Sequence, residues 1–160
     1  MILEKVESSG RVFIAVNTKE ETGIPFNDLL VAAQKKLGRD IDTAAGKARN
    51  AFVSPGELVE QEYHLAKQEA QAWLDGGKDE TAIPSSVSDH MALFGVGAEA
   101  AAAEIVATAE QWEQALATIR SARLGGKAAV RSAETIEAAE QAAKAAIAEL
   151  NAIRPPEGSL

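Results

Sequence analysis

Three separate segments of the chain place apolar residues at alternating intervals of four and three. The series are Val59, Tyr63, Ala66, Ala70 and Trp73, then Ile105, Ala109, Trp112, Leu116 and Ile119, and finally Ile136, Ala139, Ala143, Ala146 and Leu150, beside which Ile147 widens the stripe. This spacing sets the residues along one side of an α-helix, as in the seams of bundles and coiled coils. Because each stripe is short, the pattern predicts a mainly α protein, a helical bundle with heptad-like seams, rather than one long coiled coil.

Capping and helix-breaking residues predict where the helices begin and end. The expected helices run from Asn27 to Gly38, from Asp40 or Asp42 to Phe52, from the capping box Ser54–Glu57 to Leu74, from Ser85 to Phe94 with Ser88 and Asp89 as capping residues, from Ala98 to Leu124, and from Lys127 to Ile153. Together they predict a bundle over residues 24–154, with possible breaks at 75–84 and 125–126, and a tail at 155–160.

Residues 1–18 have a different pattern. Two β-prone runs flank Ser8-Ser9-Gly10, which predicts a small β hairpin. Strand alternation places Val12, Ile14 and Val16 on one face of the second run, and the other face is also apolar. A lone hairpin is only marginally stable in water, so it must pack on the helices or pair with another chain. Because both of its faces are apolar, we expect residues 1–18 to pair or pack with another chain.

The composition limits how large a core the helices can build. Apolar residues make up 46% of the chain, but aromatic residues make up only 4%. Much of the apolar fraction is alanine, which buries little area, and burial contributes about 25 cal/mol per Å². The helix contacts should therefore be thin, with Trp73 and Trp112 supplying bulk, and we expect self-association or a protein partner.

Charge and cysteine content exclude several classes of function. The net charge is −8, and an acidic surface repels nucleic acid and anionic membranes. The chain has no cysteine, which excludes thiolate chemistry and sulfur metal ligands. It has no apolar run near the roughly 20 residues of a membrane helix, and its first residues lack the pattern of a signal peptide. We therefore expect no membrane partner, and synthesis in the cytoplasm.

Two histidine-containing groups resemble sites, but each has a simpler interpretation. Glu60 and His64 stand four residues apart, as metal ligands on one helix do, yet no HExxH or related motif surrounds them. Ser88, Asp89 and His90 are the residue types of a hydrolase triad. Adjacent residues at a helix start point about 100° apart and cannot align as nucleophile, base and orienting group. We interpret Glu60 and His64 as a solvated polar pair, and Ser88 and Asp89 as helix-capping residues.

A glycine motif and a basic cluster also resemble sites and also have simpler interpretations. Residues Gly95–Ala100 match the dinucleotide fingerprint GxGxxA, but that motif requires a preceding strand, and a connection between two helices explains it better. The basic residues around Gly125-Gly126 could bind a phosphate, but nearby acidic residues favour a solvated face with ion pairs along the helices. The basic residues are Arg120, Arg123, Lys127 and Arg131, and the acidic ones are Glu110, Glu113, Glu134 and Glu137.

The helical part of the chain, residues 44–150, resembles the small alanine-rich helical proteins encoded among the tail and tail-fibre genes of tailed bacteriophages. The residues that carry this resemblance are Arg49, Tyr63, Lys67, Glu69, Ala70, Trp73, Trp112, Ile119, Arg120, Lys127 and Ala133. The resemblance implies a non-enzymatic role, either as a structural part of the virion tail or as a tail-fibre assembly factor. Assembly factors of this type have an N-terminal region rich in Trp and Tyr, which is absent here, so a structural part is favoured.

These observations give one expected function and two alternatives. We expect a baseplate- or fibre-associated tail protein that contacts other tail proteins or itself, with no catalytic residue, cofactor or metal. The alternatives are a tail-fibre assembly chaperone and a small enzyme or nucleotide-binding module using Gly95–Ala100. The residues expected at interfaces or seams are Val12, Ile14, Val16, Val59, Tyr63, Trp73, Ile105, Trp112, Leu116, Ile119, Ile136, Ile147 and Leu150.

Overall fold

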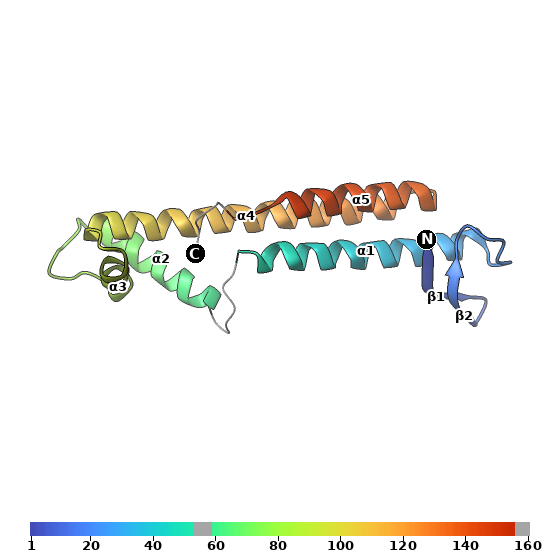
Figure 1. The fold of residues 1–160 in the computed structure, drawn as a ribbon, viewed down its shortest axis with the longest axis horizontal. Helices are drawn as coiled ribbons and strands as arrows, with labels where there is room; N and C mark the ends of the chain where they lie inside the picture. The colour runs from blue at the N-terminus through green and yellow to red at the C-terminus, as the bar shows by residue number, and fades with distance from the viewer. Residues whose placement is uncertain (53–58, 156–160) are drawn as a thin grey trace. The chain divides into compact units, whose positions relative to one another are not determined.

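The computed structural model describes residues 1–52 and 59–155, and it describes side chains in 1–52 and 61–155 (Figure 1). The elements in order are β1 (Ile2–Ser8), β2 (Arg11–Asn17), α1 (Phe26–Asn50), α2 (Val59–Asp75), α3 (Ser85–Phe94), α4 (Ala98–Ser132) and α5 (Ile136–Ala152). The predicted mainly α fold with a small N-terminal hairpin is confirmed.

The chain forms two compact units, which do not follow the expected division at residues 18–24. The terminal unit contains Met1–Ala51 together with the chain from Thr118 onward, and the middle unit contains Phe52–Ala117. The hairpin belongs to the same unit as α1 and α5, and α4 contributes to both units. The expected capping box at Ser54–Glu57 lies outside the described residues.

The middle unit is built around Trp73, near the end of α2. Trp73 packs in a cluster with Val87 of α3 and with Ala102 and Val106 of α4. Its indole Nε1 donates a hydrogen bond to the carbonyl oxygen of Asp79 at 2.9 Å. Alanines at the start of α4 let the large indole ring and the helix backbone come close. The sequence prediction that Trp73 supplies bulk is therefore confirmed.

The connection between α3 and α4 explains the glycine motif. Gly95 has a φ of 70°, and its N–H donates to the carbonyl oxygen of Met91, so it ends α3 in the left-handed conformation common at helix C-termini. A helix rather than a strand precedes it, which confirms the helix-connection reading. Helix α3 begins at Ser85 after Pro84, so Ser88 and Asp89 lie inside the helix, and their expected capping role is wrong.

The terminal unit contains α1 and α5 side by side (Figure 1). All five predicted seam positions of α5, Ile136, Ala139, Ala143, Ala146 and Leu150, are buried. On α1 the buried residues are Leu29, Ala33, Leu37, Ile41, Ala44, Ala45 and Ala48. The prediction of a seam on α5 is therefore confirmed.

The end of α4 packs against both α1 and α5. A Cβ built on Gly126 would overlap the Cβ of Ala146 and would lie 3.4 Å from Cδ1 of Ile41. Glycine at this position therefore serves close helix packing, not a turn. The expected break at Gly125-Gly126 is wrong, because packing on two neighbouring helices outweighs the intrinsic cost of about 1 kcal/mol for glycine in a helix.

Other expected helix boundaries also shift. Helix α1 runs without a break through Gly38, where two helices were expected, and it begins after Pro25, not at an Asn27 or Asp28 cap. The boundary between α4 and α5 lies instead at Thr135, whose side-chain oxygen accepts a hydrogen bond from the N–H of Ala138 at 3.1 Å. Threonine is a favourable N-cap because this bond satisfies a free helix donor.

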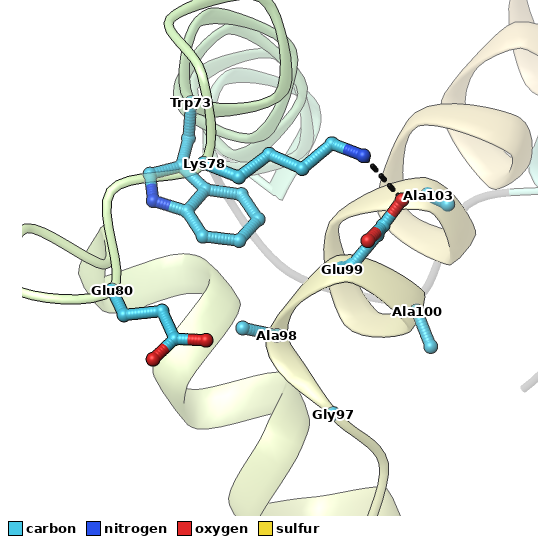
Figure 2. A pocket seen from close by; sticks show the side chains of 8 residues that line it. All are labelled: Trp73, Lys78, Glu80, Gly97, Ala98, Glu99, Ala100 and Ala103. Atoms are coloured by element: carbon cyan, nitrogen blue, oxygen red, sulfur yellow. Dashed lines mark hydrogen bonds and ion pairs between the residues drawn. The ribbon is translucent and has the colours of Figure 1, made fainter.

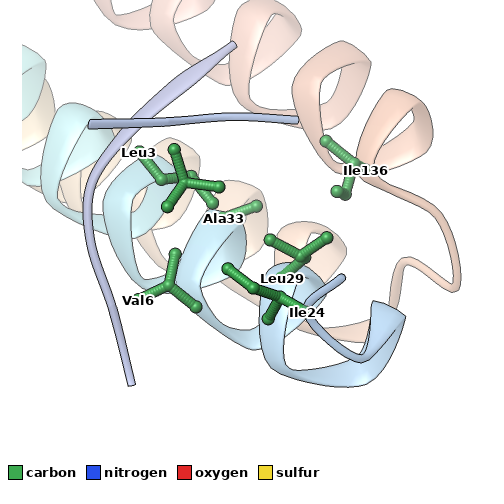
Figure 3. Close-up of a cluster of buried hydrophobic side chains, with 7 residues drawn as sticks. Leu3, Val6, Ile24, Leu29, Ala33 and Ile136 are labelled. Atoms are coloured by element: carbon green, nitrogen blue, oxygen red, sulfur yellow. The ribbon is translucent and has the colours of Figure 1, made fainter. Parts of the chain in front are cut away.

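One face of the hairpin is part of the terminal-unit core. Strands β1 and β2 pair antiparallel, and both turn residues, Ser9 and Gly10, have positive φ, as two-residue hairpin turns require. Leu3 and Val6 lie over α1 (Figure 3). The full cluster contains Leu3, Val6, Val16, Ile24, Leu29, Ala33 and Ile136.

Strand alternation breaks at Ala15, which has a φ of 56°. As a result Phe13 and Val16, three residues apart, both pack toward the core, while Val12 and Ile14 are exposed. The expectation that Val12, Ile14 and Val16 share a face is therefore wrong. The physical reason is that Ala15, in the left-handed conformation, lies between Ile14 and Val16 and places their side chains on opposite faces of the strand.

Candidate interaction surface

The hairpin presents an exposed apolar face, here called the hairpin outer face. It consists of Ile2, Lys5, Glu7, Val12 and Ile14. Ile14 is 79% exposed, Ile2 62% and Val12 56%. The register places Ile14 opposite Lys5 and Val12 opposite Glu7. These large apolar side chains face outward on an element whose other face is held by the core.

The charges of this face are paired with each other. Lys5 Nζ lies 2.6 Å from Glu7 Oε1. The hydrogen bond from Lys5, together with its positive charge, lowers the pKa of Glu7 below its ordinary value of 4.5. The face therefore offers a partner apolar side chains beside a neutral ion pair.

Backbone contacts hold the hairpin in place. The N–H of Thr18 donates to the carbonyl oxygen of Met1 at 3.0 Å, and the Thr18 hydroxyl donates to the same oxygen at 3.1 Å. These bonds close the open end of the hairpin, opposite the Ser9-Gly10 turn. The buried side chains of Leu3 and Val6 hold the hairpin on the terminal unit, with the outer face exposed.

An ion triad joins α1 to α4. Asp42 receives hydrogen bonds from Arg123 Nε and Lys127 Nζ, each at 2.6 Å. Partial burial opposes ionisation of Asp42, but the bonds from Lys127 and Arg123 outweigh this effect and hold its pKa below the ordinary 3.8. The expected ion pairs along the helix are therefore wrong for these two cations, which instead hold a neighbouring helix. Spacing along the sequence could not identify Asp42 as the partner, because it lies 81 residues from Arg123 and 85 residues from Lys127.

Polar residues of the middle unit also link helices. Lys67 of α2 binds Glu113 of α4 at 2.8 Å, and Ser86 of α3 donates to Glu69 of α2 at 2.7 Å. His90 of α3 lies 2.9 Å from Glu104 of α4, so it does not complete a triad with Ser88 and Asp89. These contacts explain Lys67 and Glu69 of α2 as connections between helices.

The predicted seam residues differ in burial. Trp73, Ile119, Ile136, Leu150 and Val16 are buried, while Ile105, Trp112, Leu116 and Ile147 are half-buried. The side chain of Val59 lies outside the described residues. Tyr63 is 47% exposed, so the expectation that it points inward is wrong. The reason is that the buried part of α2 lies around Ala70 and Trp73, and Tyr63 lies nearer the start of the helix.

Trp112 occupies an intermediate position on α4. Its indole Nε1 is buried and has no hydrogen-bond partner in the described part of the chain. Its seam neighbours Ala109 and Leu116 are half-buried as well. In the middle unit this seam is therefore only partly covered by described residues.

A shallow depression of about 580 Å³ lies beside Trp73, at the start of α4 (Figure 2). Its lining combines alanines of α4 with Lys78, Glu80 and Glu99. Lys78 and Glu99 form an ion pair, so they neutralise each other. The polar groups of the lining do not point toward one common centre, as those of a small-molecule site do.

The remaining candidate sites have local explanations. His64 Nε2 pairs with the side-chain amide of Gln68 at 3.1 Å, and the side chain of Glu60 lies outside the described residues. Within residues 1–52 and 61–155, no group of three His, Asp or Glu side chains is arranged to hold a metal. In the described chain, no single helix has the length and hydropathy of a membrane span. Helices α3 and α4 taken together meet those requirements, but they are bent by 102°.

Comparison of the chain with protein-family models, with characterised proteins and with solved structures finds no match.

Proposed function

We propose that this chain is a non-enzymatic structural protein of a bacteriophage tail, made in the host cytoplasm and acting through protein–protein contacts in the virion. The observation that carries the proposal is the hairpin outer face. The hairpin packs on the core through its other face and presents Ile14 at 79% exposure and Val12 at 56%. Exposed apolar side chains grouped on one face are typical of protein contact surfaces.

The use of charged residues supports the same proposal. Asp42, Lys67 and His90 each bind a side chain on another helix. These polar contacts hold helices together where alanine provides little buried area. Such a chain uses its polar groups to build a scaffold. The resemblance of residues 44–150 to phage tail-region proteins supplies the biological setting.

A tail-fibre assembly chaperone is the second candidate. It is favoured by a second exposed apolar group in the middle unit, formed by Leu93 at 75% and Phe94 at 54% exposure. A transient client could bind such a group and later leave. The permanent role is preferred because the hairpin outer face is backed by a buried core, which suits a lasting contact.

The location of the chain after assembly separates the two candidates. Quantitative mass spectrometry of purified particles should find the chain at a fixed ratio to the other tail proteins. As a control, the same measurement is made on infected-cell lysate fractionated to remove particles. A chain found only in the lysate, bound to a fibre protein, would overturn the structural role and support the chaperone.

A further inference from the structure

The two strands of the hairpin differ in the charge that they place at the sheet edges. β1 carries Glu4, Lys5 and Glu7, and charged residues on an edge strand discourage pairing with other chains. β2 carries one charged residue, Arg11, and continues with the apolar run 12–16. The described sheet has two strands, so the outer edge of β2 has no described strand beside it. This edge is the one open to pairing.

An antiparallel pairing of β2 with a second β2, around a two-fold axis at Phe13, suits the side chains of both copies. It sets Val12 of each copy opposite Ile14 of the other, and Phe13 opposite Phe13. β-branched and aromatic cross-strand pairs of this kind stabilise sheets, and no like charges face each other. The left-handed backbone of Ala15, which would face Arg11 of the other copy, limits the paired segment to Val12–Ile14.

The charge distribution favours a second copy as the partner. The chain carries a net charge of −8, so two copies repel each other over most of their surface. The hairpin is the exception, because Glu4 and Glu7 are offset by Lys5 and Arg11. Contact through the hairpin therefore brings two locally neutral surfaces together. A symmetric interface also requires a self-complementary patch, which the pairing of Val12 with Ile14 provides.

We propose that β2 binds β2 of a second copy of this chain, which joins the two hairpins into one continuous sheet. This inference names the partner of the β2 edge, beside the hairpin outer face, and it rests on the proposed function only in assigning the hairpin to protein contacts. The paired segment is short, so the dimer is weak and its formation depends on concentration.

Sedimentation equilibrium of the purified full chain, from about 1 μM to about 1 mM, tests the proposal in the range of weak interfaces. Wild-type protein should show a monomer–dimer equilibrium. Ile14→Lys should raise the dissociation constant about tenfold, because the symmetric interface loses two cross-strand pairs at once. Leu93→Lys is the matched control, since Leu93 is 75% exposed and Ile14 79%. It should leave the dissociation constant unchanged.

A mixing experiment tests the register. Ile14→Lys and Val12→Glu, each weakened alone, should form a mixed dimer when combined, because the register sets the introduced lysine opposite the introduced glutamate. Wild-type protein that stays monomeric throughout, equal losses for Ile14→Lys and Leu93→Lys, or no gain on mixing would overturn the proposal. The proposed function fails separately, because purified protein can dimerise whether or not the chain is found in particles.

Discussion

Gly126 and Gly125 are neighbours in α4 with opposite surroundings. A Cβ at Gly126 would overlap Ala146, whereas a Cβ at Gly125 would meet nothing within 4 Å. Gly126→Ala should therefore destabilise the chain by about 1–3 kcal/mol, as overpacking does. Gly125→Ala should stabilise it by about 0.5–1 kcal/mol, because alanine is the better helix former. Urea unfolding of both variants provides the measurement, and changes of the same sign would contradict the close packing of α4 on α5.

Asp42 supplies a prediction about pH. Its folded-state pKa is lowered, so its contribution to stability is complete above the ordinary pKa of 3.8 and is lost as the pH falls through the lower folded value. At pH 7, Asp42→Asn should lower the free energy of unfolding by about 1 kcal/mol, a small value because the side chain is partly exposed and solvent screens its charge.

The comparison of wild type and Asp42→Asn is made by thermal unfolding at several pH values. The difference between them should shrink below about pH 4 as the carboxylate is protonated. Asp40→Asn is the control on the same helix, because Asp40 pairs with Lys36, one turn away on α1 itself, and not with a cation of the triad. A difference that persists unchanged at low pH would show that Asp42 stabilises the chain by something other than its charge.

At the scale of elements, the hairpin has one structural face and one exposed face. Val6 is fully buried on α1, and Val12 is 56% exposed. Val6→Ala should cost about 2 kcal/mol, in the range of methyl deletions from a core. Val12→Ala should change the stability of the monomer by less than about 0.5 kcal/mol. Equal losses, measured by urea unfolding at low protein concentration, would contradict the assignment of the two faces.

The seam of α5 could be predicted from sequence because nothing interrupts its period. All of its predicted positions, from Ile136 to Leu150, are buried. The continuity of α1 and α4 could not be predicted in the same way. Gly38 and Gly125-Gly126 are local helix-breaking signals of about 1 kcal/mol each, and contacts with distant helices override them. Those contacts depend on which helices become neighbours, which the local sequence does not contain.

The hairpin and the ion triad show a second limit. Alanine rarely adopts positive φ, so nothing in the sequence marks Ala15 as the point where the strand turns over. The sequence shows that residues 12–16 are apolar, but it does not show which of their side chains face outward. Likewise Arg123 and Lys127 were recognisable as a basic pair, but their partner Asp42 lies on another helix.

At the scale of the whole molecule, the described chain combines two compact units with separate cores. The middle unit centres on Trp73, and the terminal unit carries the hairpin. The net charge of −8 resides outside the hairpin strands, where acidic and basic side chains balance. We therefore propose that the helices serve as a scaffold and that the hairpin contacts other chains.

The most direct test of the proposed tail role is the copy number of the chain in purified particles of the bacteriophage that the proposal requires to encode it. Quantitative mass spectrometry compares wild type, Ile14→Lys and the control Leu93→Lys, each relative to another tail protein. The account predicts a fixed ratio for wild type and Leu93→Lys, and a strong loss for Ile14→Lys. A chain missing from all particles, or one incorporated equally in all three cases, would contradict it.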